Sequence, residues 1–267
     1  MNGHVTRYYQ SAGGEGEFFE STPLHEIPER ECAFEEALSL APNLPKGWYE
    51  LAHLSSEDRI EFVKGYWHMR LPFVPHIRKL ISHFFAQIDD IGIFLVQRRS
   101  GQPHLAEMVY SLSEDRGFFH GSPGASGDAL EELEEAFPSV TFPPDYLAFL
   151  QIHDGFCKGS DSGLLPSARI PLAYENLQGY LEEREPLQLP GQEEVDPRQL
   201  IPFYQSFGLP CYQAFYADWY PEGGMGNLYY SGEAHTLSNF QKRALWADNM
   251  AFPTFLDWLV FYLEVLA

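Results

Sequence analysis

Histidine is the first residue type to consider for catalysis or metal binding, and this chain has 10 of them. They are scattered, without the H-E-x-x-H or H-x-H spacing that brings two imidazoles to one metal ion. His153, beside Asp154, lies in an apolar helical pattern, and His83 lies between Ile81 and Phe85 in another. Such positions favour core histidines over bases or ligands. We therefore expect no catalytic residue, no metal and no cofactor.

Two glycine- and serine-rich stretches could carry nucleophilic or phosphate chemistry. Residues 159–163, Gly-Ser-Asp-Ser-Gly, place an aspartate where a G-x-S-x-G nucleophile elbow has serine. Residues 121–127 precede a helix, but no Lys-Ser/Thr pair follows and that helix is acidic, which favours a linker. The sequence thus favours a protein that is not an enzyme. An undetected hydrolase stays open, and it requires a pocket with at least two convergent ionisable groups of perturbed pKa.

Two groups of residues have the composition of a protein-binding surface. The first is the acidic face of a predicted helix, which is solvated or meets a cationic partner. The second is a loop after an aromatic cluster, where aromatic anchors mix with acidic side chains. For this loop, packing under the last helix is an equal alternative. The candidate partner-binding residues are Glu131, Glu132, Glu134, Glu135, Asp218, Trp219, Tyr220 and Glu222.

Residues 128–156 must position the first group. Leu130, Leu133 and Phe137 recur at i, i+3 and i+7, which predicts an amphipathic helix with its glutamates on the opposite face. The Pro-Pro pair at 143–144 opens a second helix, which the sequence predicts to stop at Gly155. Both helices are expected to pack their apolar faces onto the elements that follow.

The rest of the chain predicts helices, then strands, then a closing helix. Residues 1–30 are rich in Gly, Ser and Glu, and Gly-Gly-Glu-Gly-Glu at 13–17 predicts a mobile piece. The final apolar run, residues 252–266, is short and broken by acidic residues, so it predicts a buried helix. The other predicted elements are helices at 29–40, 55–71, from 75 onward and at 175–185, a hairpin of strands 91–97 and 105–112, and antiparallel strands at 201–203, 212–216 and 228–230.

The net charge restricts the class of partner. The chain carries a formal charge of -21 at pH 7, and residues 121–267 hold 21 Asp/Glu against 6 Lys/Arg, near -15. Such a surface repels phosphate backbones, so we expect no nucleic-acid binding. The same field accelerates encounter with a basic protein, in a salt-dependent way. The expected partner is therefore a protein, and a basic one.

Cysteine usage and hydropathy indicate the compartment. The 3 cysteines, Cys32, Cys157 and Cys211, are far apart and lack C-x-x-C spacing, which disfavours a disulfide framework or a zinc site. No stretch approaches the roughly 18 apolar residues of a membrane span, and the first residues lack a signal-peptide pattern. We expect a cytoplasmic protein without membrane contact.

Several motifs of the second half occur in the order of a known family. Phe-Pro-Pro-Asp-Tyr at 142–146, Phe-Leu at 149–150 and His-Asp-Gly-Phe at 153–156 follow the glutamate-rich helix. With the strand motifs near 200–203, 211–215 and 226–230 and the last helix, they resemble the SMI1/KNR4 (SUKH) family over residues 121–267. Two departures are Asp154, where the family usually has asparagine, and a long acidic insert at 177–197.

The resemblance implies the fold class and the function. The expected fold is α+β, a mainly antiparallel or mixed sheet with packed helices, as a SUKH-like domain at 121–267 preceded by a helical and hairpin region at 1–120. Bacterial members of the family resemble immunity proteins that neutralise toxins, often nucleases, whereas fungal members are regulators and scaffolds. The sequence therefore predicts a non-enzymatic protein-binding module of the immunity type, with a regulatory adaptor as the alternative.

Overall fold

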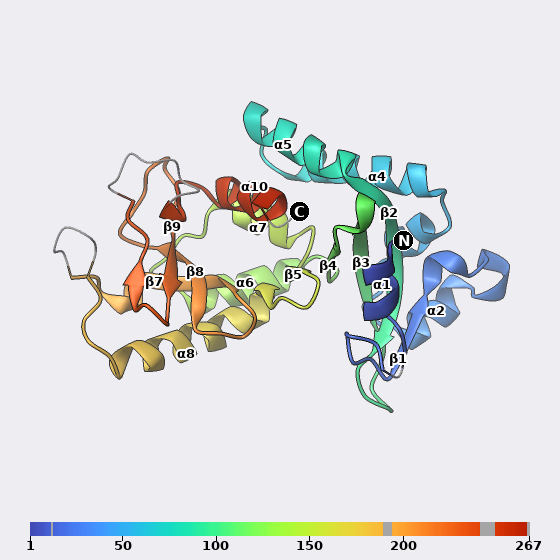
Figure 1. The fold of residues 1–267 in the computed structure, drawn as a ribbon, viewed down its shortest axis with the longest axis horizontal. Helices are drawn as coiled ribbons and strands as arrows, with labels where there is room; N and C mark the ends of the chain where they lie inside the picture. The colour runs from blue at the N-terminus through green and yellow to red at the C-terminus, as the bar shows by residue number, and fades with distance from the viewer. Residues whose placement is uncertain (12, 189–193, 241–248, 266–267) are drawn as a thin grey trace. The chain divides into compact units, whose positions relative to one another are not determined.

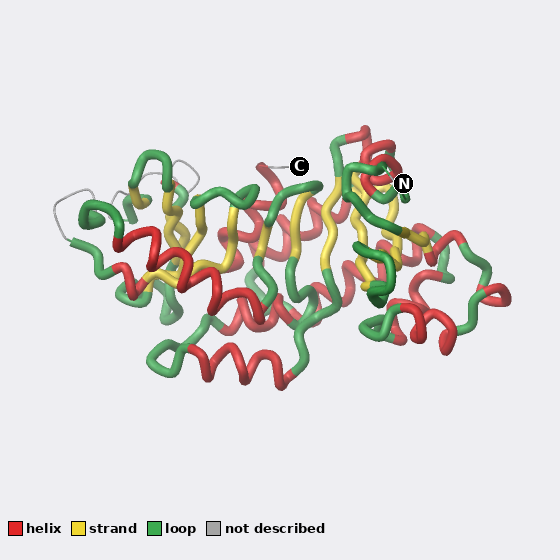
Figure 2. Tube along the Cα trace, turned by 90° about the horizontal axis from the view of Figure 1, so that it is seen from below, coloured by secondary structure: helices red, strands yellow, loops and turns green. Residues whose placement is uncertain are grey.

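The computed structural model of this chain describes residues 1–11, 13–188, 194–240 and 249–265 (Figure 1). These residues form two compact units. The first contains residues 1–124 and 152–160, and the second contains residues 125–151 and 161–265. The chain thus leaves the first unit beside the glycine-rich stretch at 121–127 and returns to it once. In each unit, helices flank the strands, which are yellow in Figure 2.

The first unit is built on an antiparallel sheet with the strand order β1-β2-β3-β4-β5. The hairpin predicted from residues 91–97 and 105–112 is confirmed, with Ile93 paired to Met108. Its strands are covered on both faces, since almost every side chain from Ile91 to Val96 is buried. The strands are β1 (Glu20–Pro23), β2 (Ile88–Gln97), β3 (Leu105–Leu112), β4 (Phe118–Gly121) and β5 (Phe156–Lys158).

Local sequence signals set the helices of this unit. Ser55 caps α4, because its side chain accepts a hydrogen bond from the backbone N–H of Asp58, and Pro75 begins α5. The predicted helix at 29–40 is shorter, because a 3-10 turn (η2, Glu29–Glu31) precedes α2. The helices are α1 (Gly3–Tyr8), α2 (Phe34–Leu40), α3 (Lys46–Ala52), α4 (Ser56–Arg70) and α5 (Pro75–Ala86), with further 3-10 turns η1 (Leu24–Glu26) and η3 (Ser113–Asp115).

Opposite faces of the sheet pack against different helices. On one face, the aromatic rings of Tyr110 and Phe119 contact Trp67 of α4 and Phe84 of α5. On the other, Val109 and Phe118 belong to a buried cluster with residues of α1 and the segment after it, Val5, Tyr8, Tyr9 and Phe18. The alternation of side chains along a strand therefore divides the core of this unit into two layers.

Residues 13–23 form backbone hydrogen bonds and a strand pairing that the sequence did not predict. Glu15 and Gly16 donate backbone hydrogen bonds to Arg7 and Tyr8, so residues 13–17 form a bonded turn where a mobile piece was expected. β1, for which the sequence made no prediction, pairs with β2. β1 depends on a partner strand about 75 residues away, which a local sequence window does not contain.

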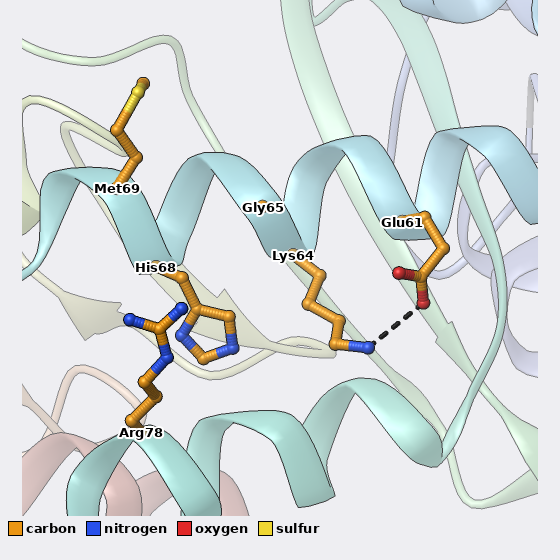
Figure 3. A pocket seen from close by; sticks show the side chains of 6 residues that line it. All are labelled: Glu61, Lys64, Gly65, His68, Met69 and Arg78. Carbon is orange, nitrogen blue, oxygen red and sulfur yellow. Dashed lines mark hydrogen bonds and ion pairs between the residues drawn. The ribbon is translucent and has the colours of Figure 1, made fainter. Parts of the chain in front are cut away.

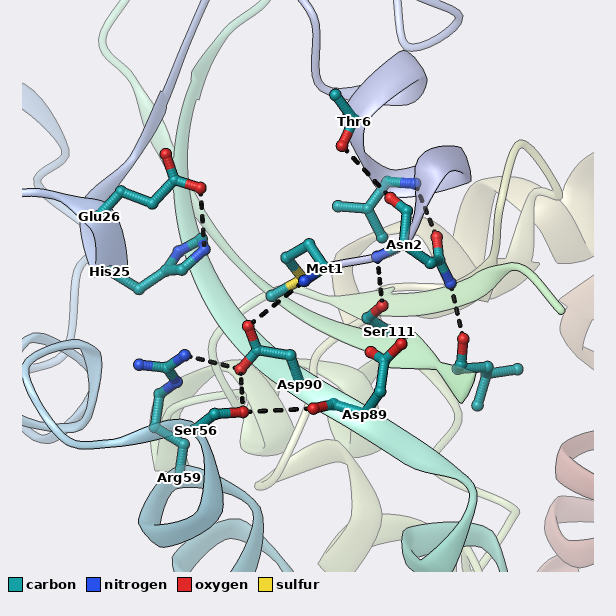
Figure 4. A network of polar contacts seen from close by, with 12 residues as sticks. Met1, Asn2, Thr6, His25, Glu26, Ser56, Arg59, Asp89, Asp90 and Ser111 are labelled. Atoms are coloured by element: carbon teal, nitrogen blue, oxygen red, sulfur yellow. Dashed lines mark hydrogen bonds and ion pairs between the residues drawn. The ribbon is translucent and has the colours of Figure 1, made fainter. Parts of the chain in front are cut away.

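A network of hydrogen bonds and ion pairs joins α4 to the first residues of β2 (Figure 4). Asp90 accepts hydrogen bonds from the Arg59 guanidinium at 2.6 Å and the Ser56 hydroxyl at 2.7 Å, and the amino group of Met1 lies 3.6 Å away. Burial raises the pKa of the Asp90 carboxyl, but the bonds from Ser56 and Arg59 outweigh burial and the pKa is lowered. The carboxylate is thus the ionised centre of this network.

The second unit has its own antiparallel strands, in the order β6-β7-β8-β9-β10, with β11 also paired to β9. The meander predicted at 201–203, 212–216 and 228–230 is confirmed. The strands are β6 (Gly163–Leu164), β7 (Leu200–Gln205), β8 (Cys211–Tyr216), β9 (Asn227–Ser231), β10 (Thr236–Leu237) and β11 (Ala251–Phe252).

Helices cover both faces of this sheet as well. Leu177 and Leu181 of α8 pack in a cluster with Tyr212, Ala214 and Tyr216 of β8. The predicted helix at 175–185 is thus part of α8, and of the acidic insert, residues 189–193 lie outside the described chain. The helices are α6 (Gly127–Ala136), α7 (Pro144–Leu150), α8 (Ile170–Glu182) and α10 (Phe255–Val265), with the 3-10 turns η4 (Ser167–Arg169) and η5 (Pro197–Gln199).

The opposite face carries the aromatic core of the second unit. Phe203 and Phe215 pack with their ring centroids 4.4 Å apart. The ring of Tyr146 on α7 contacts both of them, and Phe255 on α10 contacts Phe203 and Tyr146. Trp258 adds an edge contact to Phe203 at 4.8 Å. Each such buried aromatic side chain stabilises the fold by about 1.5–3 kcal/mol through burial alone. The last helix is buried, as its apolar pattern predicted.

Helix α7 ends earlier than the sequence predicted. It stops at Leu150 rather than Gly155, and Gln151 is its C-cap. His153 therefore lies in the turn after the helix, with Gly155 at φ 99°. Among the described residues, no helix is long and apolar enough to cross a membrane.

Candidate protein-binding surface

Helix α6 presents the first group of predicted partner-binding residues. The Ser126 hydroxyl accepts a hydrogen bond from the backbone N–H of Ala129 and caps the helix. Leu130 and Leu133 are buried, so the residues between them point outward. The glutamates at 131, 132, 134 and 135 are all exposed. The structure thus brings these four carboxylates together on one helical face.

The charges of this face work against the stability of the helix. In the described chain none of the four glutamates forms an ion pair, and the last turn of α6 contains no basic residue. Glu131 lies three and four positions before Glu134 and Glu135, where like charges repel by about 0.2–0.5 kcal/mol per pair. Glu134 and Glu135 also lie at the negative end of the helix dipole. Carboxylates that cost the helix stability and have no internal partner are available to an external cation.

The second predicted group lies on the loop between β8 and β9. Backbone bonds from Gly226 to Trp219 and from Tyr216 to Gly226 close this loop. The Trp219 ring is half-buried and stacks on Phe240 with centroids 4.7 Å apart, so it anchors the loop against the core. Asp218, Tyr220 and Glu222 are exposed, Tyr220 by 50%. The acidic side chains of the loop are exposed, as predicted, but Trp219 packs on Phe240 and not under the last helix.

The two predicted groups are separate patches. Within the described residues, no hydrogen bond, ion pair or ring contact joins the glutamates of α6 to the loop at 217–226. α6 contacts η4 and α8, whereas the loop lies beside Phe240 and, through Gly224, beside Pro143. Whether either patch binds a partner stays a prediction.

Sequence reasoning missed an exposed apolar turn in the same unit. Phe207 and Leu209, between β7 and β8, are 64% and 55% exposed. Asp161 holds the turn, because its carboxylate accepts bonds from the Phe207 N–H and the Tyr204 hydroxyl. The signal was present in the sequence Ser-Phe-Gly-Leu-Pro, which places two large apolar residues where hairpin turns are usually polar.

The two histidines considered for chemistry have different surroundings. His153 is 1% exposed and is a core residue, as predicted. His83 is exposed, so the expectation of a core histidine is wrong there. The reason is helical phase, since the buried face of α5 consists of Ile77, Ile81, Phe84 and Phe85 and leaves position 83 outside.

The first unit contains a cavity of about 310 Å³ along α4 and α5 (Figure 3). Its lining includes Lys64 and His68 from α4 and Arg78 from α5, and Lys64 is paired with Glu61 at 3.0 Å. Burial, then the charges of Arg78 and Lys64, lowers the pKa of His68. This basic hollow lacks a nucleophile activated by an oriented base. In the described part of the chain, no group of three or more His, Cys, Asp or Glu side chains is placed to hold a metal ion.

The second unit is an antiparallel sheet between helices, with exposed carboxylates on its first helix, and this arrangement defines an α+β protein. The model of the SMI1 / KNR4 family (SUKH-1) matches residues 124–257, half of the 267-residue chain. The chain therefore belongs to the SMI1/KNR4 (SUKH-1) family, and the predicted family is confirmed. No curated protein and no solved structure matches this chain.

Proposed function

We propose that this protein is a non-enzymatic binding module whose second unit presents carboxylates to a basic protein partner. The observation that carries the proposal is the face of α6, where four exposed glutamates repel one another and have no internal cation among the described residues. Surface charges that lower the stability of their own helix favour a role of that helix in recognition. The net charge of -21 supports the same choice and disfavours nucleic acid.

The finer proposal is an immunity function. The family contains proteins that resemble toxin-neutralising immunity proteins, and an acidic surface complements the basic substrate groove of a nuclease. Three free cysteines agree with a reducing cytoplasm as the place of action. In this proposal the protein blocks its partner by occupying the groove, and it needs no cofactor or membrane.

A regulatory adaptor is the second candidate. It is favoured by the exposed apolar side chains of α4 and the turn after it, since Phe62, Met69 and Phe73 are 63%, 71% and 71% exposed. Clusters of this kind mark protein contacts. An adaptor would engage its partner through this first-unit surface, and replacing the α6 glutamates would leave that binding unchanged.

The experiment compares matched charge variants. The full chain is used to capture proteins from the native host at 50 mM and 300 mM NaCl, and the captured partner is then purified for titration. We expect a basic partner whose affinity falls at least tenfold across this salt range, because screening weakens opposed charges. Glu→Gln at 131, 132, 134 and 135 should lower the affinity about 10–100-fold.

The control variant carries the same charge change elsewhere. Glu→Gln at the exposed positions 29, 31, 35 and 57 of the first unit should change the affinity less than threefold. Equal losses in both variants would reduce the proposal to a non-specific effect of net charge. Salt-independent binding, or binding that only substitutions at Phe62 and Met69 abolish, would favour the adaptor instead.

The loop at 218–222 is tested on the same purified partner. Tyr220→Ala removes an exposed ring that has no structural role in the loop closure, so a loss of about tenfold or more places the loop in the interface. Trp219→Ala is the less clean variant, because the ring also packs on Phe240. Unchanged affinity for Tyr220→Ala and Asp218→Asn would remove the loop from the proposed surface.

A further inference from the structure

Three residues from neighbouring strands of the first unit meet on the face that α1 covers. His120 on β4 pairs directly with Cys157 on β5 and with Val109 on β3. Glu107 lies two residues before Val109, so the period of the strand places it on the same face. Glu107, His120 and Cys157 therefore form a line across three strands. The sequence shows no sign of this cluster, because Glu107 and Cys157 are 50 residues apart along the chain.

Hydrogen-bond geometry fixes the protonation of His120. Its Nδ1 lies 3.1 Å from Glu107 Oε2, and its Nε2 lies 2.9 Å from the Gly159 carbonyl oxygen. A carbonyl oxygen only accepts, so Nε2 carries a proton. Glu107 Oε2 also accepts a bond of 2.6 Å from the Tyr9 hydroxyl, so the carboxylate is an acceptor and Nδ1 carries a proton too. His120 is thus an imidazolium.

The sulfur of Cys157 lies beside the same proton. Cys157 Sγ is 3.1 Å from His120 Nε2, which places it within reach of a charge-assisted hydrogen bond. Burial acts to lower the pKa of His120, but the Cys157 sulfur and the Glu107 carboxylate outweigh it and the pKa is raised well above its ordinary value. Glu107 keeps a lowered pKa although it is buried, through its bonds to His120 and Tyr9.

Charged groups surround the Cys157 sulfur on the face that α1 covers. Glu107 contributes one negative charge, His120 one positive charge, and the Arg98 guanidinium, 3.6 Å from Glu107 Oε1, a second positive charge. The other groups that face His120 are the rings of Tyr8 and Tyr9, at 5.3 and 6.1 Å, whose own pKa values are raised mainly by burial, so both are neutral. His120 is thus the buried positive charge nearest to the sulfur, because the Arg98 side chain is half-exposed to solvent.

A purely structural role explains these contacts less well. A buried carboxylate–imidazolium pair gains little stability over an apolar pair, because desolvation cancels most of the attraction. The cluster is also not arranged as a metal site among the described residues. Cys157 is only partly buried, so a small reagent can reach it, while its two partners are 5% and 6% exposed. An oriented, protonated imidazole beside a partly exposed sulfur is an arrangement found at activated cysteines.

We propose that Cys157, His120 and Glu107 form a redox-sensitive thiol site, independent of the proposed protein-binding function, at which small hydroperoxides oxidise Cys157 reversibly. The Cys157 thiolate attacks one peroxide oxygen, a S–O bond forms and the O–O bond breaks. Sulfur is oxidised by two electrons to a sulfenic acid, and the leaving oxygen takes the Nε2 proton of His120 and departs as water or an alcohol. Two molecules of a small cellular thiol then reduce the sulfenic acid, releasing water and their disulfide, and return the proton to His120.

The first test is the reactivity of Cys157 against pH in the full wild-type chain. Peptide mass spectrometry follows alkylation of the three cysteines by iodoacetamide from pH 4.5 to 9.5. Cys32 and Cys211 are internal controls, and burial raises the pKa of Cys32. For each cysteine, the alkylation rate at pH 6 is divided by the rate at its high-pH plateau. We expect this ratio to be at least tenfold larger for Cys157 than for either control. A Cys157 profile with the midpoint of an ordinary thiol, about 8.5, overturns the proposal.

The second test separates the cluster from general burial. His120→Gln and Glu107→Gln should shift the midpoint of Cys157 upward by at least one pH unit, whereas His153→Gln, which removes another buried histidine of this unit, should leave it unchanged. With one equivalent of hydrogen peroxide, a sulfenic-acid reagent such as dimedone should label Cys157 in the wild type. Labelling at Cys32 or Cys211 instead, or an equal shift in all three variants, contradicts the proposal. Neither readout depends on a protein partner.

Discussion

His153 shows how a single residue can be fixed by bonds that the sequence does not reveal. Its Nε2 accepts a bond of 2.6 Å from the Tyr110 hydroxyl, and its Nδ1 donates one of 2.8 Å to the Ser122 carbonyl oxygen. Trp67 in turn donates to the Tyr110 oxygen. A Cβ at position 121 would lie 2.6 Å from Nδ1, which is why a glycine stands there. The imidazole is neutral in this setting, and burial lowers its pKa to about 4.

The pKa of His153 predicts a loss of stability in acid. In the unfolded chain the imidazole has an ordinary pKa near 6.5, so the unfolded state binds the extra proton first as the pH falls. Stability is complete above pH 6.5 and declines as the pH falls toward 4. Between pH 7 and 4.5 this residue should cost about 2 kcal/mol in the free energy of unfolding. Urea denaturation at both pH values should show a smaller loss in His153→Gln, and an equal loss would mean that other groups cause it.

At the scale of secondary structure, α6 is a helix whose charges oppose its own dipole. Asp128 in the first turn is favourable, but Glu134 and Glu135 at the other end are not. Buried Leu130 and Leu133 keep the helix in place against η4 and α8. Packing therefore supplies the stability that the surface charges reduce, and this leaves the acidic face free to serve recognition.

Removing the two C-terminal glutamates should stabilise the helix. Glu134→Gln with Glu135→Gln should raise the free energy of unfolding by about 0.5–1 kcal/mol at low salt. The double substitution removes two carboxylates from the negative end of the helix dipole and also removes their repulsion of Glu131. Asp128→Asn is the matched control, and it should lower stability by a few tenths to about 1 kcal/mol. Denaturant titration at 10 mM salt measures both. Destabilisation by the double variant would show that these carboxylates have internal partners.

At the scale of the whole molecule, negative charge is in large excess. The chain has 38 acidic against 17 basic residues, and several of the ion pairs among described residues lie on the exposed surface. Exposed pairs contribute little, about 0–1 kcal/mol each. Self-repulsion of the excess charge therefore opposes the folded state.

Added salt should therefore stabilise the protein. Raising NaCl from 10 to 150 mM shortens the Debye length from about 30 to about 8 Å, so we expect a rise in Tm of roughly 2–4 °C. The variant with Glu→Gln at 131, 132, 134 and 135 should show a smaller rise. Thermal denaturation followed by circular dichroism is sufficient. A Tm that falls with salt would show that attractive pairs, and not the excess charge, dominate the electrostatics.

The sequence by itself determined the elements whose signals are local. The alternation at 91–97 gave the buried strand, the Pro-Pro pair gave the start of α7, and the motifs of the second half gave the family, since each depends on residues only a few positions apart. It also identified the glutamates of α6 as an exposed face.

Tertiary structure alone decided the rest. It ended α7 at Leu150, exposed His83, turned Trp219 toward Phe240 and drew β1 into the sheet. Above all, it aligned Glu107, His120 and Cys157, because strand register joins residues that no sequence window contains. Periodicity tells which side of an element a residue occupies, but only the pairing of distant strands determines which side chains meet there.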